Sequence, residues 1–206
     1  MQTLAPLTAE EHARLDADPP WQRIHGWTTF APIYDAAVAE ARDGDRFVEV
    51  GTYLGRSAAY MADAIRRSGK RIDFVTCDIF STEHYAAGEY DGQPVATLDV
   101  VRQNLGLLCD RYVRVEQIAS VELARRYANE SVAFCFIDAD HSYAAVMADM
   151  AWWQKIQPLG VLSGHDFPNY EGVRRAVMEA FGLWGPSELD PQSWRVRKRN
   201  DGNGVL

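Results

Sequence analysis

The chain has 206 residues, 47% of them hydrophobic and 24% charged, which suits one soluble globular domain with a substantial core. The formal net charge of -8 disfavours a nucleic-acid partner, because such partners are held largely through neutralised phosphates. No apolar run is long enough to cross a bilayer, and no secretory signal is recognisable. The three scattered cysteines are typical of a reducing compartment. We therefore expect a cytoplasmic protein without a membrane partner.

The first helix is predicted by a capping box. Thr8 and Glu11 have the spacing of such a box, so a short helix is expected over Ala9–Asp16 and is stopped by the prolines at 19 and 20. A second helix is expected over Pro32–Arg42 from its apolar periodicity. Together these residues make an N-terminal segment, 1–45, ahead of a core at 46–206.

The residues between these helices are aromatic and irregular. Trp21, His25 and Trp27 cluster within Trp21–Thr29. Two interpretations stay open: a flap over a substrate, or core packing for the first helix.

Residues 46–57 change from a strand to a helix through two glycines, and the helix is expected to continue through Ala58–Arg67. Gly51 can adopt backbone angles closed to other residues and leaves room for a ligand against the main chain. Free N–H groups at the start of the helix favour an anionic group there. The spacing of Gly51 and Gly55 differs from the dinucleotide fingerprint Gly-x-Gly-x-x-Gly. It favours a looser loop suited to a carboxylate, with an ordinary strand-to-helix turn as the alternative.

The rest of the chain alternates strand-like and helix-like segments. Strands are predicted at Arg71–Cys77, Tyr112–Glu116, Val132–Ile137 and Val161–Ser163, and helices at Val95–Leu108, at Val121–Tyr127 with Ser120 as its cap, after the cap Ser142, and at Tyr170–Phe181. This alternation predicts an α/β fold with a Rossmann-like, doubly wound, mostly parallel sheet covered by helices on both faces.

The chain is expected to end in an antiparallel hairpin. Leu183–Leu189 and Trp194–Arg199 are predicted as two strands, and their short connection permits only antiparallel pairing. They bring the expected sheet to seven strands. The basic cluster Arg195–Arg199 is expected to protect a sheet edge rather than to grip a partner.

Two further features point to a binding site. Asp78 ends the second predicted strand, where a carboxylate can accept hydrogen bonds from ribose hydroxyls; a helix or loop cap is the alternative. Ile79–Pro94 has little periodicity and contains a histidine and two tyrosines. A loop of that length is unusual in a compact domain unless it serves a site, so we interpret it as a lid or substrate wall.

Titratable side chains follow two of the predicted strands. Asp138, Asp140 and His141 come after Val132–Ile137, and His165 and Asp166 come after Val161–Ser163. Ligands of open α/β sheets bind beyond the carboxyl ends of the strands, and so many titratable groups require a cation or substrate between them.

A divalent cation is the simplest organiser of these groups. Mg²⁺ suits the oxygen ligands of Asp138 and Asp166. His165 is a third candidate, although imidazole is preferred by Zn, Mn or Fe. The alternative is that these acids only cap the helices that follow.

These residues carry a resemblance to a known family. The run Phe47–Ser57 resembles the first motif of class I S-adenosylmethionine-dependent methyltransferases, particularly the catechol O-methyltransferase-like branch. Ile137–Tyr143 and Gly164–Phe167 are similar to a bacterial group of small class I methyltransferases, some of which act on antibiotic sugars. The resemblance covers about residues 46–181.

The resemblance implies a role for each matching residue. Gly51, Tyr53 and Ser57 would line the methionine part of S-adenosylmethionine, and Glu49 would support its ammonium group. Asp78 would bind the ribose, while Gln117 and Ser120 would lie near the adenine. Asp138 would contact both the cofactor and the cation. Asp166, with or without His165, matches the second metal element. The family usually has adjacent acid or amide ligands there, so His165 or Phe167 is a departure that leaves the metal's identity and presence open.

The implied reaction moves a methyl group to a hydroxyl oxygen of a small molecule, with Mg²⁺ or Mn²⁺ as the expected assisting cation. His141 matches a basic catalytic residue of the catechol-type members and Asp140 a proposed base of the sugar-modifying relatives; we prefer His141, because an imidazole takes up a proton near neutral pH. The branch is often dimeric, so a homodimer is expected. The rival interpretations are a cofactor-binding module without catalysis and a related metal-dependent hydroxylase.

Overall fold

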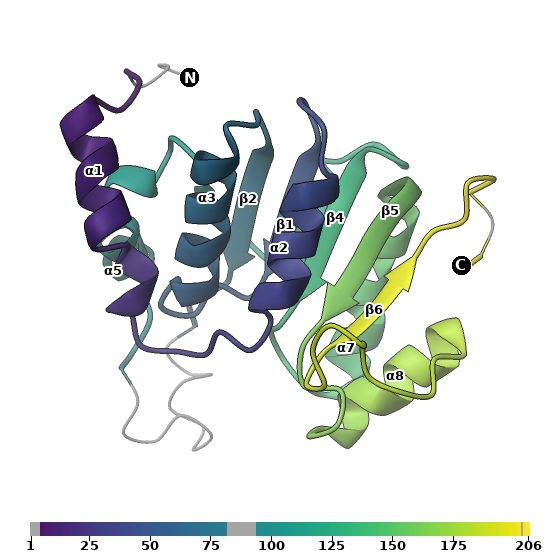
Figure 1. Cartoon of the computed structure of the whole chain (residues 1–206). Coiled ribbons are helices and arrows are strands. Elements are labelled where there is room, and N and C mark those ends of the chain that lie inside the picture. The colour runs from purple at the N-terminus through teal and green to yellow at the C-terminus, as the bar shows by residue number, and fades with distance from the viewer. Residues whose placement is uncertain (1–4, 82–93, 203) are drawn as a thin grey trace.

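The computed structural model describes residues 5–81, 94–202 and 204–206, and within them the strands form one six-stranded sheet in the order β3-β2-β1-β4-β5-β6. The strands are β1 (Arg46–Val50), β2 (Asp73–Asp78), β3 (Arg114–Gln117), β4 (Val132–Ile137), β5 (Ile156–Gly164) and β6 (Trp194–Arg197). Strands β1 to β5 are mutually parallel, and β6 runs antiparallel to β5 (Figure 1).

Helices cover both faces of the sheet. They are α1 (Ala9–Ala17), α2 (Ala31–Glu40), α3 (Arg56–Ser68), α5 (Leu98–Leu105), α6 (Ser120–Ala124), α7 (Tyr143–Asp149) and α8 (Glu171–Phe181), with short 3-10 helices at Pro20–Gln22, Gly106–Leu108 and Met150–Gln154. Residues of α2, α3 and α5 belong to one apolar cluster, and residues of α6, α7 and α8 belong to another. None of the described helices combines the length and the apolar character needed to cross a membrane.

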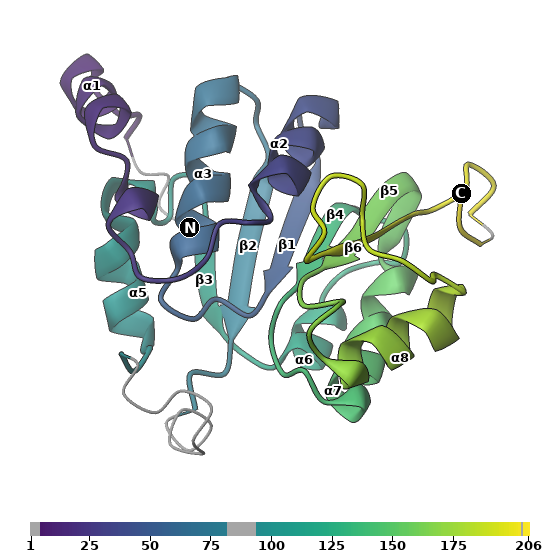
Figure 2. The same ribbon diagram turned by 60° about the horizontal axis from the view of Figure 1, so that its bottom comes forward.

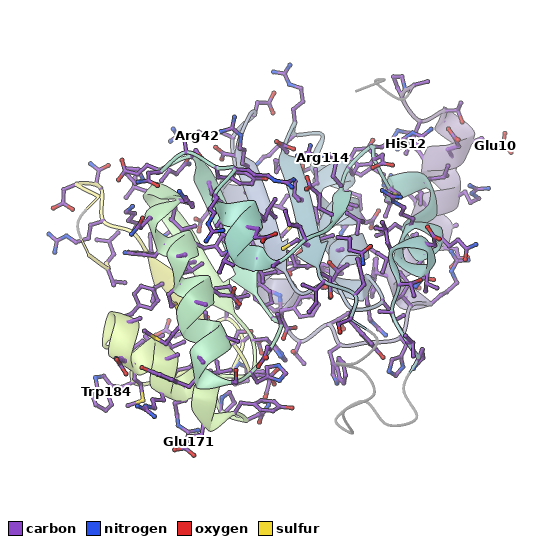
Figure 3. The ribbon with its side chains drawn as sticks, turned by 180° about the vertical axis from the view of Figure 1, so that it is seen from behind. Glu10, His12, Arg42, Arg114, Glu171 and Trp184 are labelled. Atoms are coloured by element: carbon purple, nitrogen blue, oxygen red, sulfur yellow. The ribbon has the colours of Figure 1, made fainter. Side chains whose placement is uncertain are left out.

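The predicted doubly wound α/β fold is confirmed, but the count of seven strands is wrong. Leu183–Leu189 forms no strand, and Trp184 in this segment is 81% exposed and projects beyond the end of α8 (Figure 3). Gly185 and Pro186 weaken any strand here, since proline lacks the N–H that a ladder needs. The antiparallel partner of β6 is instead β5.

The basic cluster begins on an edge strand, as expected, because β6 lies at the end of the sheet. Arg195 and Arg197 of this strand both form ion pairs with Glu40 of α2. These contacts tie the edge strand to the N-terminal segment.

Two of the three predicted caps are present. The Thr8–Glu11 capping box starts α1, and the Ser142 hydroxyl accepts a hydrogen bond from the N–H of Ala145 at 3.3 Å. The prediction for Ser120 is wrong, because Ala119 occupies the N-cap of α6. The Ser120 hydroxyl lies within the helix and accepts a hydrogen bond from Trp152 Nε1 at 2.8 Å.

The sheet order fixes where a ligand can bind. Strands β2 and β3 follow β1 on one side, while β4, β5 and β6 lie on the other, so the order in which strands are added to the sheet reverses between β1 and β4. A crevice at the carboxyl ends of strands forms at such a switch point. The connection from α1 to α2 runs across this edge (Figure 2). Of the predicted lid, residues 82–93 lie outside the described part of the chain.

Candidate active site

Gly51 brings the ends of β1 and β4 into direct contact. Its φ of +91° lies in a region that L side chains rarely adopt, and a Cβ added there would lie 1.8 Å from the carbonyl oxygen of Asp138. Both backbones are fixed, since the N–H of Asp138 donates to Val50 and the N–H of Gly51 donates to Cys77. Glycine is therefore required here, and it places Asp138 beside the loop.

Asp78 holds the loop that follows β1. Its Oδ2 atom accepts hydrogen bonds from the N–H groups of Thr52 and Tyr53, both at 3.0 Å, and Oδ1 accepts one from Phe80 at 2.8 Å. Tyr53 has a φ of +47°, so the carboxylate stabilises an uncommon backbone conformation. This is the capping role that the sequence left open, and Oδ1, which accepts only one of these bonds, keeps a second lone pair for a ligand.

Glu49 lies beneath the loop and is only 1% exposed. It accepts hydrogen bonds from the hydroxyls of Tyr34 at 2.6 Å and Thr76 at 2.7 Å, and a further one from Ser57. Burial raises the pKa of Glu49 to about 7, against its ordinary value of 4.5, although the three hydroxyls oppose this change. The buried carboxyl group thus connects α2, β2 and α3 beneath the loop.

Replacing Glu49 by glutamine tests this burial. Because the pKa is higher in the folded state, the wild-type carboxyl contributes stability that is fully present below pH 4.5 and is lost as pH rises through about 7. Relative to Glu49→Gln, the wild type should lose about 2 kcal/mol of unfolding free energy between pH 5.5 and 8. Urea unfolding of both proteins at the two pH values measures this difference. A difference that does not change with pH would show that Glu49 stays ionised in the folded protein.

Two cavities meet at the carboxyl edge of the sheet. The larger has a volume of about 820 Å³ and the smaller about 270 Å³. They share four wall residues, Gly51, Tyr53, Asp138 and Ala139. A ligand that spans both cavities would therefore pass over Gly51 and Asp138.

The cavities collect most of the predicted site residues. The larger is lined by Gly51, Tyr53, Ser57, Asp138, His141, His165 and Asp166, and the smaller by Gly51, Tyr53, Asp78, Ser120, Asp138 and Asp140. Glu49 and Gln117 line neither of these two cavities; the Gln117 amide donates to the carbonyl oxygen of Ile79 at 3.2 Å.

Acids and histidines gather on one wall of the larger cavity. Asp138, His165 and Asp166 each offer a ligand atom, and these atoms all lie within 4.8 Å of one another. Two carboxylates and an imidazole at this separation fit a divalent cation such as Mn²⁺. Asp166 Oδ2 is also 3.2 Å from Nε2 of His141, whose ring stacks on Tyr170 with centroids 4.0 Å apart.

The charges in this cluster are strongly coupled. Burial opposes protonation of His141, but Asp138 and Asp166 outweigh it and raise the pKa of His141 to about 10. Burial alone would raise the pKa of Asp166, whereas hydrogen bonds from His141 and His165 hold it well below its usual range. Asp166 thus carries a negative charge at neutral pH and attracts a positive partner.

Several residues of the cavity walls were missed by the sequence predictions. They are Thr29, Arg56, Asn169, Tyr170 and Gln192 in the larger cavity and Asp149 in the smaller one. Arg56 had a signal, because it lies between Gly55 and Ser57 in the loop motif. The others come from segments whose approach to the site depends on the packed fold.

A doubly wound sheet with a glycine loop after β1 and an acid after β2 defines the class of α/β proteins that bind nucleotides or related cofactors. A family model described as a methyltransferase domain matches residues 48–167, and the chain belongs to this family. Family membership confirms the predicted S-adenosylmethionine-dependent methyltransferase at the level of the family.

Solved structures agree with this fold. The O-methyltransferase NovP is similar with a TM-score of 0.61 at 15% identity, covering 83% of this chain and 80% of NovP. A protein from Corynebacterium glutamicum gives 0.58 at 14% identity, with 95% and 92% covered. An O-methyltransferase from Bacillus cereus in complex with SAH gives 0.52 at 20% identity, with 93% and 91% covered. At these identities the similarity shows a shared fold.

Proposed function

We propose that this protein transfers a methyl group from S-adenosylmethionine to a hydroxyl oxygen of a small molecule, assisted by a divalent cation. One observation carries the proposal: Asp138 belongs both to the common wall of the two cavities and to the cluster of possible cation ligands. A methyl donor in one compartment and a cation-bound acceptor in the other would meet at this residue. The O-methyltransferases with the same fold support the choice of an oxygen acceptor.

The smaller cavity suits the nucleoside part of the cofactor. Its wall is apolar at Val50, Ile79 and Ile118, as a flat base requires, and Asp78 stands among these residues. Asp78 would accept a hydrogen bond from a ribose hydroxyl through the remaining lone pair of its Oδ1 atom. Gly51, Tyr53 and Ser57 continue from there into the larger cavity and would line the methionine part.

Asp138, His165 and Asp166 would hold the cation, which when bound would lower the pKa of the acceptor hydroxyl and polarise it. S-adenosylmethionine supplies the electrophilic methyl group and its own leaving group. The protein's contribution is then alignment, because fixed reactants avoid a large entropy cost. The aromatic side chains of Trp27, Phe30 and Tyr170 line the acceptor side of the larger cavity and would bind an apolar or sugar-like body.

We assign the proton acceptor to His141 in preference to Asp140. His141 lines the larger cavity with Asp138 and Asp166. Asp140 lines the smaller cavity, and its Oδ1 accepts a hydrogen bond from the N–H of Ser142 at 2.7 Å. His141 can be neutral only if another positive charge balances its two carboxylate partners. The bound cation would provide that charge.

Calorimetry and turnover test the proposal together. The protein should bind S-adenosylhomocysteine (SAH), and methyl transfer to a panel of hydroxylated aromatic compounds and sugars should fall at least about 10-fold in EDTA and return with Mg²⁺ or Mn²⁺. Absence of SAH binding would overturn the cofactor assignment. Turnover that is insensitive to the chelator would remove the cation, and SAH binding without turnover of any acceptor would favour a non-catalytic binding module.

A further inference from the structure

The N-terminal segment reaches the acid–histidine cluster through two consecutive residues. The hydroxyl of Thr29 lies 2.7 Å from Nε2 of His165, a residue 136 positions further along the chain. The ring of Phe30 meets the ring of His165 edge-on, with centroids 6.3 Å apart and planes at 79°. The imidazole is thus held by Thr29 at one nitrogen and by the ring contact with Phe30.

The other nitrogen of the imidazole faces the carboxylates. Nδ1 of His165 lies 3.2 Å from Oδ2 of Asp166. A histidine that ligates a metal offers the lone pair of one nitrogen, and its other N–H almost always donates to an oxygen. The hydroxyl oxygen of Thr29 is such an acceptor.

We propose that Thr29 is a positioning residue, which accepts a hydrogen bond from Nε2–H of His165 and so leaves the Nδ1 lone pair directed at the cation. This inference rests on the proposed cation site. It also gives the N-terminal segment a role in the reaction centre, beyond the flap or packing roles that the sequence suggested.

The fold fixes the position of this hydroxyl. Phe30 is 2% exposed and packs against Tyr34 at 4.8 Å and Phe136 at 5.7 Å between ring centroids. Helix α2 begins directly after it, and the N–H of Ala31 donates to the carbonyl oxygen of Thr28. Thr29 is therefore anchored on its C-terminal side by a buried ring and a helix start, although its own side chain is exposed.

The segment is anchored on its other side as well. The guanidinium of Arg56, at the start of α3, donates to the carbonyl oxygen of Ile24 at 3.0 Å. Ile24 is buried in the same apolar cluster as Phe30. Both flanks of residues 25–29 are thus attached to the core, which keeps the Thr29 hydroxyl beside His165.

Three variants of the full-length protein separate the hydroxyl from its packing. Thr29→Val keeps the shape of the side chain and removes the hydroxyl, Thr29→Ser keeps the hydroxyl, and Thr28→Val makes the same change at the neighbouring position. Titration calorimetry with Mn²⁺ should show about 10- to 100-fold weaker binding for Thr29→Val. Thr29→Ser and Thr28→Val should bind Mn²⁺ within about 3-fold of the wild type, because both keep the hydrogen bond between the residue 29 hydroxyl and His165.

A second measurement reports on the ring itself. Long-range ¹H–¹⁵N spectra of the Mg²⁺-saturated wild type should show His165 protonated at Nε2, and Thr29→Val should lose this single tautomer. SAH affinity should be equal in all four proteins, because Thr29 lies on the acceptor side of the site.

The outcomes separate this inference from the proposed function. Wild-type Mn²⁺ affinity in Thr29→Val, or equal losses in Thr29→Val and Thr29→Ser, would overturn the role of the hydroxyl while leaving the cation site intact. A wild type that binds SAH but no Mn²⁺ would overturn both the cation site and this inference. Loss of SAH binding would instead contradict the cofactor assignment.

Discussion

Gly51→Ala is expected to abolish cofactor binding and to destabilise the protein by about 2–5 kcal/mol. The added methyl group would lie 1.8 Å from the carbonyl oxygen and 2.6 Å from the carbonyl carbon of Asp138. A clash with backbone is not relieved by a side-chain rotation, and both strands are held by hydrogen bonds at this point. The loop must therefore move away from Asp138, which separates the two walls that the cavities share.

Gly69→Ala is the matched control. Gly69 also has a positive φ, +68°, but a Cβ there would meet no atom within 4 Å. This variant should cost about 1 kcal/mol and leave SAH binding unchanged. Urea unfolding and calorimetry with SAH measure both effects. If Gly51→Ala matched Gly69→Ala in stability and affinity, the close contact between β1 and β4 would not be a requirement of the site.

Asp166→Asn is expected to lower turnover by at least about 100-fold and to weaken Mn²⁺ binding by a similar factor. Asp166 Oδ2 lies 3.2 Å from both His141 Nε2 and His165 Nδ1, so one carboxylate serves the proposed base and a proposed ligand. The amide keeps the shape and one oxygen but loses the negative charge that attracts a cation.

The same substitution at an exposed acid shows whether the effect on Mn²⁺ binding and turnover comes from the charge at the site or from the net charge of the protein. Asp99→Asn, in the first turn of α5, should leave Mn²⁺ affinity and turnover unchanged. Calorimetry with Mn²⁺ and methyl-transfer assays compare the two variants. Equal activity in Asp166→Asn and Asp99→Asn would place the cation and the base elsewhere in the cavity.

Much of the site follows from local pattern alone. Short apolar runs that end in polar residues predicted β4 and β5, and parallel strands share one carboxyl edge. Asp138, His141, His165 and Asp166 could therefore be placed together without knowing any contact between them. The glycine loop was predictable for the same reason, since strand, turn and helix are consecutive in the chain.

The register after β5 needed the folded chain. The sequence left open whether Asp166 acts with His165 or alone, and it identified His165 or Phe167 as the departure from the family pattern. In the structure Phe167 is 3% exposed and packs in the cluster beneath α8, while His165 lines the larger cavity. Asp166 has a φ of +59°. This backbone conformation ends the strand pattern in which successive side chains point to opposite faces, so the direction of each side chain could not be read from the strand.

Burial likewise changed the interpretation of Glu49. The resemblance implied that Glu49 supports the ammonium group of the cofactor, and this stays a prediction; the structure adds that its buried side chain accepts a hydrogen bond from Tyr34. The partner of β6 was also mistaken, because the nearer segment, Leu183–Leu189, was chosen over β5. Strand pairing depends on which edge of the sheet is unpaired, and this is known only when the whole sheet has formed.

By itself the sequence determined the α/β class, the order of the elements and the acids at the strand ends, because each depends on residues close together in the chain. Only the tertiary structure decided that Thr29 contacts His165 and that Asp78 holds the loop after β1. Such contacts join residues far apart in the sequence, and their formation depends on how the two faces of the sheet are packed.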